Sequence, residues 1–300
     1  MNPFFKDYSA YLAEFFPGTK VQKISVNTGS GCPNRDGTVG TGGCIYCDNA
    51  SFTPGYCLEG GSVAAQLEAG KRFFRRKYPK MKYLAYFQSY TSTHRNSLQR
   101  LAAQYREALE VEDVLGIIVA TRPDCLPDDV LCLLEEINQG RPVFVELGVE
   151  TLCDHTLRLI NRGHTARQAC DAICRAAGRR LHVGVHLIAG LPGENDERVL
   201  ETLRGICSLP VESVKMHHLQ VLRQTPLAAM LERGEVGVES YTLERYLDLC
   251  VRMVEAVPHH IAIERFLASS PPEKVISPKW GLKNYEFMNL LLRKLSQNPK

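Results

Sequence analysis

The sequence predicts an α/β fold, a partial (β/α)6 TIM-like barrel of parallel strands followed by a mainly helical C-terminal extension. Six short apolar runs are separated by helix-length segments, which is the pattern of right-handed crossovers between parallel strands. The 300 residues, of which 44% are hydrophobic, suffice to bury a core of barrel size. Beyond Pro226 the pattern is largely helical, and a separate second domain is not required.

The expected strands are apolar on both faces, as strands covered by helices are. They cover residues 21–27, 82–88, 114–120, 142–150, 181–190 and 213–222. Helices are expected between them, with Ser62, Thr165 and Asn195 as N-caps because a side-chain oxygen can accept a free backbone N–H at a helix start. These helices cover 63–78, about 97–110, 127–138, 166–178 and 195–207.

We expect three parts along the chain: an N-terminal segment, 1–20, the barrel core, 21–225, and a helical extension, 226–300, packed on that core. Helical patterns in the extension cover 225–234, 240–257 and 283–296, and 258–280 has room for a short strand and a proline-rich loop.

Composition excludes several classes of protein. No apolar run approaches the roughly 18 residues that span a bilayer, and the first residues lack the basic and apolar regions of a signal peptide. We therefore expect a cytoplasmic protein without a membrane partner, whose eleven cysteines stay free, bind metal or do chemistry. The net charge of +3 is too small to indicate nucleic-acid binding by itself.

The loop after the first expected strand contains three cysteines within sixteen residues. It reads SGCPNRDGTVGTGGCIYCDNA, with Cys32, Cys44 and Cys47. Loops at the carboxyl ends of barrel strands build active sites, and a Cys-x2-Cys turn lets two sulfurs reach one metal centre. Three thiolates are one short of a closed zinc site but can hold a [4Fe–4S] cluster with one iron open. Spacing alone leaves two alternatives: zinc completed by Asp48, Cys57 or a distant histidine, and a dithiol redox pair.

The motif GCPNRDGT…GGCIYC resembles the radical S-adenosylmethionine enzymes, and among them the branch of the elongator catalytic subunit and its short YhcC-like relatives. The long first spacing differs from the commonest motif, Cys-x3-Cys-x2-Cys, and is similar to that of this branch. The resemblance runs from about Lys23 to Trp280. It implies a [4Fe–4S] cluster, S-adenosyl-L-methionine bound to the open iron, and reductive cleavage to a 5′-deoxyadenosyl radical.

The resemblance also implies cofactor contacts at later positions. Tyr46 would lie near the adenine, Gln88 and Ser89 would replace the glycines that meet the methionyl amine, and Gly190 would allow close approach of the adenine-side loop. Glu150 suits the ribose hydroxyls as a bidentate acceptor, and the fork of Arg162 suits the methionyl carboxylate. A helix-terminal charge and a surface arginine are the alternatives for these two. Further lining residues are expected in HHLQVL: His218 and Gln220.

The elongator-like branch implies tRNA as the partner, and the wobble uridine as the modified nucleoside. The stretch 71–83, KRFFRRKYPKMKY, could follow a phosphate backbone, although a solvated helix face is the alternative. Residues expected to contact substrate are Arg122, Asp124, His218, Lys279 and Trp280. The alternatives for these residues are an ion pair or turn for the first two, a satisfied core histidine, and a packed tryptophan that anchors the last helix.

An electron donor such as flavodoxin or ferredoxin is a further expected partner, whereas the sequence indicates no oligomeric state. Two other functions stay open. One is a radical enzyme acting on a small metabolite or peptide, and the other is a non-catalytic, zinc-stabilised RNA-binding protein.

Overall fold

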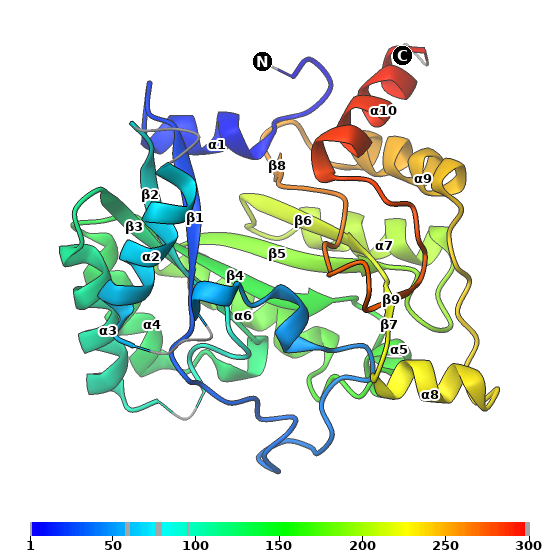
Figure 1. Cartoon of the computed structure of the whole chain (residues 1–300), viewed down its shortest axis with the longest axis horizontal. Helices are drawn as coiled ribbons and strands as arrows, with labels where there is room; N and C mark the ends of the chain where they lie inside the picture. The colour runs from blue at the N-terminus through cyan, green and yellow to red at the C-terminus, as the bar shows by residue number, and fades with distance from the viewer. Residues whose placement is uncertain (1, 58–60, 76–79, 95, 298–300) are drawn as a thin grey trace.

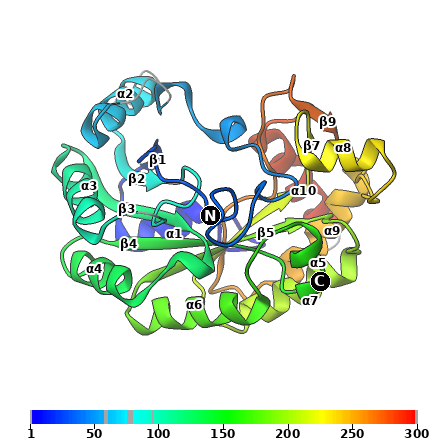
Figure 2. The same ribbon diagram turned by 90° about the horizontal axis from the view of Figure 1, so that it is seen from below.

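The computed structural model describes residues 2–57, 61–75, 80–94 and 96–297. Within them, parallel strands form one seven-stranded sheet in the order β1-β2-β3-β4-β5-β6-β8, which curves into an incomplete ring with helices on its outside (Figures 1 and 2). The strands are β1 Val21–Val26, β2 Lys82–Phe87, β3 Val114–Thr121, β4 Val143–Glu150, β5 His182–Ala189, β6 Ser213–His218 and β8 Ala262–Ile263. This is the predicted partial barrel.

Helices alternate with the first six strands, as predicted, and the C-terminal part is mainly helical. Their bounds are α1 Tyr8–Phe15, α2 Val63–Arg75, α3 Leu98–Glu110, α4 Asp128–Asn138, α5 Asp154–Leu159, α6 Ala166–Gly178, α7 Asp196–Cys207, α8 Pro226–Glu232, α9 Leu243–Ala256 and α10 Asn284–Gln297. The predicted N-caps are confirmed. Ser62 Oγ accepts from Ala65 N, and Thr165 forms a capping box with Gln168.

The sixth strand is shorter than predicted, and this is a correction to the sequence interpretation. β6 ends at His218, and Leu219 N still donates to the Ala189 carbonyl of β5 at 2.8 Å. The chain then leaves the sheet, and β7, Val221–Leu222, pairs antiparallel with β9, Val275–Ser277. An apolar run cannot reveal this break, because both β6 and β7 are buried.

Helix α1, which the sequence analysis did not place, closes the amino-terminal end of the barrel. Tyr11 and Leu12 pack with interior side chains of β2, β3, β4 and β8. The Tyr11 and Phe144 rings meet edge to face at 6.0 Å. The opposite, carboxyl end of the strands is therefore the end open to a ligand.

In the C-terminal extension, α9 packs against both α7 and α10. The predicted boundaries at 20/21 and 225/226 stay predictions. No helix in the described ranges has the length and apolar character needed to cross a bilayer.

Candidate active site

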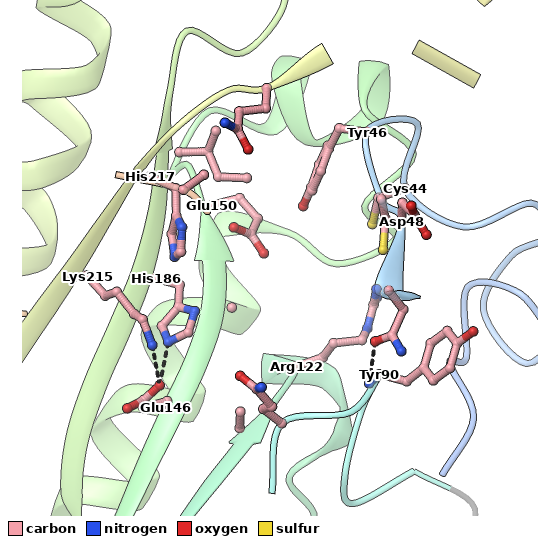
Figure 3. Close-up of a pocket in the computed structure, with 18 of the residues that line it drawn as sticks. Cys44, Tyr46, Asp48, Tyr90, Arg122, Glu146, Glu150, His186, Lys215 and His217 are labelled. Atoms are coloured by element: carbon pink, nitrogen blue, oxygen red, sulfur yellow. Dashed lines mark hydrogen bonds and ion pairs between the residues drawn. The ribbon is translucent and has the colours of Figure 1, made fainter. Parts of the chain in front are cut away.

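A cavity of about 260 Å³ opens at the carboxyl ends of the strands. Cys32, Cys44 and Cys47 all border it, so the structure brings the three predicted metal ligands to one space. Figure 3 shows Cys44, Tyr46 and Glu150 around this space, although they come from a loop and from the end of β4. In parallel barrels this end carries the reacting groups.

The eleven-residue insert between the first two cysteines is held by two asparagines. The fully buried Asn34 donates through Nδ2 to the backbone carbonyl of Asn161. The backbone carbonyl of Asn34 accepts from Gly43 N at 2.7 Å. Asn161 Nδ2 donates in turn to the carbonyls of Thr41 at 3.0 Å and of Gly43 at 2.8 Å. These contacts tie the insert to the segment after α5. Sequence reasoning missed both asparagines, although asparagine in a glycine-rich loop is a signal for side-chain-to-backbone bonding.

Two N–H donors lie close to the sulfur atom of Cys44. Asn34 Nδ2 lies 3.8 Å and Arg162 Nη1 lies 3.6 Å from Cys44 Sγ, within hydrogen-bond range for sulfur. Burial, with the neighbouring thiol of Cys44, raises the pKa of Cys47 to about 11, and Arg35 opposes the rise. Hydrogen bonds to the sulfurs tune the reduction potential of iron–sulfur clusters, so this donor set fits such a cluster.

The described residues contain no group of three or more His, Cys, Asp or Glu side chains placed to hold one metal ion. The thiolates that hold a cubane each meet a different iron, so they need not converge on one point. Two of the ligands considered for a zinc site have other contacts. Asp48 accepts from Lys274 Nζ at 2.7 Å, and the Cys57 thiol donates to the Ser25 carbonyl at 3.2 Å.

Glu150 and Arg162 contact each other at the edge of the cavity. Arg162 Nη2 lies 3.2 Å from Glu150 Oε1 and donates to the Gly148 carbonyl at 2.5 Å. Glu150 has φ +70°, a conformation that costs a non-glycine residue about 1–3 kcal/mol and is found where the fold enforces it. A Cβ at Gly148 would stand 2.7 Å from Arg162 Nη2, so a larger residue there would displace the guanidinium. The strained turn aims the carboxylate at the guanidinium.

Deeper in the barrel lies a buried charge cluster that sequence reasoning missed. Glu146, 4% exposed, binds Lys23 at 2.5 Å and Lys215 at 3.3 Å. Its carboxylate also accepts from Tyr86 OH at 2.7 Å and lies 2.6 Å from His186 Nε2; Figure 3 shows Lys215 and His186 directed at it. Burial acts to raise the pKa of Glu146, but Lys215 and Lys23 outweigh it and hold that pKa well below its usual range.

Of the predicted substrate residues, Arg122 and His218 border the cavity, whereas Asp124, Lys279 and Trp280 are not among its lining residues. Arg122, 2% exposed, borders the cavity and forms a bidentate ion pair with Asp124, both contacts at 2.9 Å. Its buried Nη1 has no hydrogen-bond partner among the described residues. His218 also borders the cavity, but it stacks on Trp280 at 4.5 Å. Trp280 Nε1 donates to the Tyr241 carbonyl at 3.2 Å, and the neighbouring Lys279 is exposed.

Among the remaining predicted cofactor residues, Ser89 and Gly190 are not lining residues of the cavity, whereas the others are. Tyr46, Gln88 and Gln220 border the cavity, and the buried Gln220 Oε1 has no partner in the described part of the chain. Ser89 is buried beside Asn49, at 3.5 Å from its Nδ2. Gly190, with φ +86°, faces Tyr241, where an added Cβ would come within 2.9 Å of the ring. All of these roles stay predictions.

The sequence comparisons agree with this geometry. Residues 26–206 match the Radical SAM superfamily, and residues 211–297 match the Radical_SAM C-terminal domain. The chain belongs to the radical SAM superfamily. Its 38% identity to protein YhcC of Escherichia coli strain K12, over 285 residues, covers 94% of this chain and 89% of YhcC.

More distant similarity places this radical SAM enzyme beside elongator-type proteins. It is 26% identical over 186 residues to the tRNA uridine(34) acetyltransferase of Methanocaldococcus jannaschii, covering 58% of this chain and 33% of that protein. The solved structure of Methanocaldococcus infernus Elp3, with its N-terminus deleted, matches with a TM-score of 0.66 at 18% identity. That match covers 93% of this chain and 63% of the Elp3 chain, and it shows a shared fold.

Proposed function

We propose that this radical SAM enzyme holds a [4Fe–4S] cluster on Cys32, Cys44 and Cys47, binds S-adenosylmethionine at the open iron, and modifies the wobble uridine of tRNA. The observation that carries the proposal is that the three thiols border one cavity at the carboxyl ends of the strands. Cys32, Cys44 and Cys47 would hold the cluster, which when reduced would supply the electron for cleavage of S-adenosylmethionine to methionine and a 5′-deoxyadenosyl radical.

The chain's own residues bind and orient the cofactor in this proposal. Tyr46 offers a ring face to the adenine, and Glu150 accepts hydrogen bonds from the ribose hydroxyls. Arg162 already lies between Glu150 and Cys44, so it can hold an incoming carboxylate close to the cluster loop. Behind the radical, Glu146 and its buried ion partners line the inner end of the cavity.

A tRNA substrate is supported by the similarity to a tRNA uridine(34) acetyltransferase and to elongator-type proteins. The basic stretch 71–83 gives weaker support than its sequence suggests. Lys71 is buried against Glu68, and Lys82 pairs with Asp113. Arg76 and Lys77 lie outside the described residues. The exposed cations among the described ones are Arg72, Arg75 and Lys80, and Arg75 also lies 3.9 Å from Asp113. A tRNA substrate favours a cytoplasmic location, and reduction of the cluster would need a donor such as flavodoxin or ferredoxin.

Two measurements test the proposal. Anaerobically reconstituted protein should carry roughly four irons per chain and form 5′-deoxyadenosine from S-adenosylmethionine after reduction, and Cys44→Ser should do neither. One tightly held zinc and no 5′-deoxyadenosine would instead favour the zinc-stabilised RNA-binding protein.

The substrate is tested separately, by nucleoside mass spectrometry of tRNA from a deletion strain. A wobble nucleoside should disappear, return with the wild-type gene, and stay absent with the Cys44→Ser gene. Unchanged tRNA from a strain whose protein still cleaves S-adenosylmethionine would refute the tRNA assignment. A small metabolite or a peptide would then be the substrate class to examine.

A further inference from the structure

A second cavity, of about 910 Å³, adjoins the candidate active site. It is bordered by α1, β1 and α2 on one side and by residues after β8 on the other, so it lies at the open edge of the incomplete barrel. Tyr86, Lys215 and Arg265 border both cavities, which are therefore neighbours along one wall. A ligand in the second cavity can reach toward the first without crossing the sheet.

Aromatic rings form much of the second cavity's wall. They are Tyr8, Tyr56, Phe73, Phe74 and Tyr86. Phe73 is 69% exposed, which is unusual for so large an apolar side chain, and its ring lies 6.5 Å from that of Tyr56. Exposed rings beside a cavity offer a stacking surface to a planar group.

The charges between the two cavities do not balance. Lys23, Lys215 and Arg265 supply three positive charges, whereas Glu146 and Glu264 supply two negative ones. Both carboxylates form ion pairs with the two lysines. Lys23 lies 2.5 Å from Glu146 and 2.6 Å from Glu264, and Lys215 lies 2.9 Å from Glu264. Among the described residues of this partly buried cluster, Arg265 is thus the cation without an ion-pair partner, and an unmatched charge is costly there.

Arg265 also has an unused donor. Its Nε is buried and has no hydrogen-bond partner in the described part of the chain. The nearby histidines do not add to the charge: burial, followed by Arg265, lowers the pKa of His217 well below its usual range and that of His218 to about 3. The position therefore lacks one anion with acceptor oxygens.

We propose that Arg265 binds an oxyanion of the substrate, namely the phosphate of a nucleotide whose ring stacks on the aromatic wall of the second cavity. This inference rests on the proposed function and names the route by which its substrate enters. A guanidinium suits phosphate because its fork donates two parallel hydrogen bonds. Tyr56 and Phe73 then hold the base at the open edge of the barrel.

The test uses the reconstituted protein and its single tryptophan, Trp280, as the reporter. Trp280 stacks on His218, which borders the first cavity, so its fluorescence should respond to a ligand at Arg265. Uridine 5′-monophosphate and uridine are titrated in parallel, because they differ only in the anion. The variants are Arg265→Gln, Arg265→Lys and, as the matched control, Arg141→Gln at an exposed position.

We expect the monophosphate to bind wild type and Arg141→Gln at least about tenfold more tightly than uridine, a preference of about 1.4 kcal/mol. Arg265→Gln should bind both equally, and Arg265→Lys should keep part of the preference because it keeps the charge. An anticodon stem-loop RNA that displaces the monophosphate would place the bound nucleotide in RNA, and failure to displace it would favour a free nucleotide.

Two results would overturn the inference. One is a phosphate preference that survives Arg265→Gln. The other is a loss of S-adenosylmethionine binding in that variant with an unchanged nucleotide preference, which would assign Arg265 to the cofactor. Neither readout requires radical chemistry, so failure to form 5′-deoxyadenosine would refute the proposed function and leave the oxyanion site to be judged by binding alone.

Discussion

Glu146→Gln is expected to destabilise the folded chain by about 3–5 kcal/mol, the cost of removing one partner from a buried ion pair. Glutamine keeps the shape and can still bond Tyr86 and His186, but it leaves Lys23 and Lys215 with the single carboxylate of Glu264. The loss is therefore due to unmatched charge rather than to a cavity.

Urea unfolding followed by circular dichroism measures this effect on matched preparations. The control is Glu201→Gln, which removes a carboxylate from an exposed pair with Arg198 at 2.6 Å and should cost less than about 1 kcal/mol. The double variant Lys23→Met with Glu146→Gln removes one charge of each sign and so returns the cluster to its wild-type net charge, and it should recover much of the lost stability. If Glu146→Gln stays within about 1 kcal/mol of wild type, the reasoning about the buried cluster is refuted.

Two further predictions concern the cysteine loop and the barrel interior. Gly43→Ala should retain less iron after gel filtration than Gly42→Ala. Both glycines have positive φ, but only at Gly43 would the new Cβ come 2.8 Å from Nε of Arg35, whose side chain donates to the Cys47 carbonyl. Equal iron contents would contradict this. Between pH 6 and 5 the free energy of unfolding should fall less steeply with falling pH in His217→Gln than in wild type, by up to about 1.4 kcal/mol per pH unit. Burial lowers the pKa of His217 in the folded chain, so below about pH 6.5 the unfolded chain binds a proton that the folded chain does not, and stability falls. The measurement is urea unfolding of both proteins at several pH values. If the unfolding free energies of wild type and His217→Gln change with pH in the same way, the prediction about His217 is refuted.

Most of the fold could be predicted because it depends on local pattern. Apolar runs of strand length located the first five strands to within a few residues, and Thr165 marked its helix start through a capping box. The break after His218 could not be predicted, since it depends on pairing between Val221–Leu222 and a segment more than fifty residues later. Helix α1 was missed for a similar reason, because its partners lie inside the barrel.

The sequence by itself determined the family and located the three cysteines proposed as cluster ligands, because one short motif within one loop contains the signal for both. Only the tertiary structure decided that Lys23 meets Glu146 and Glu264, which lie 123 and 241 residues away along the chain. It also decided that, among the described residues around the two cavities, Arg265 is the cation without a matching carboxylate. Charge balance inside a barrel depends on which strands are neighbours and which side chains point inward, and no single segment of sequence contains that information.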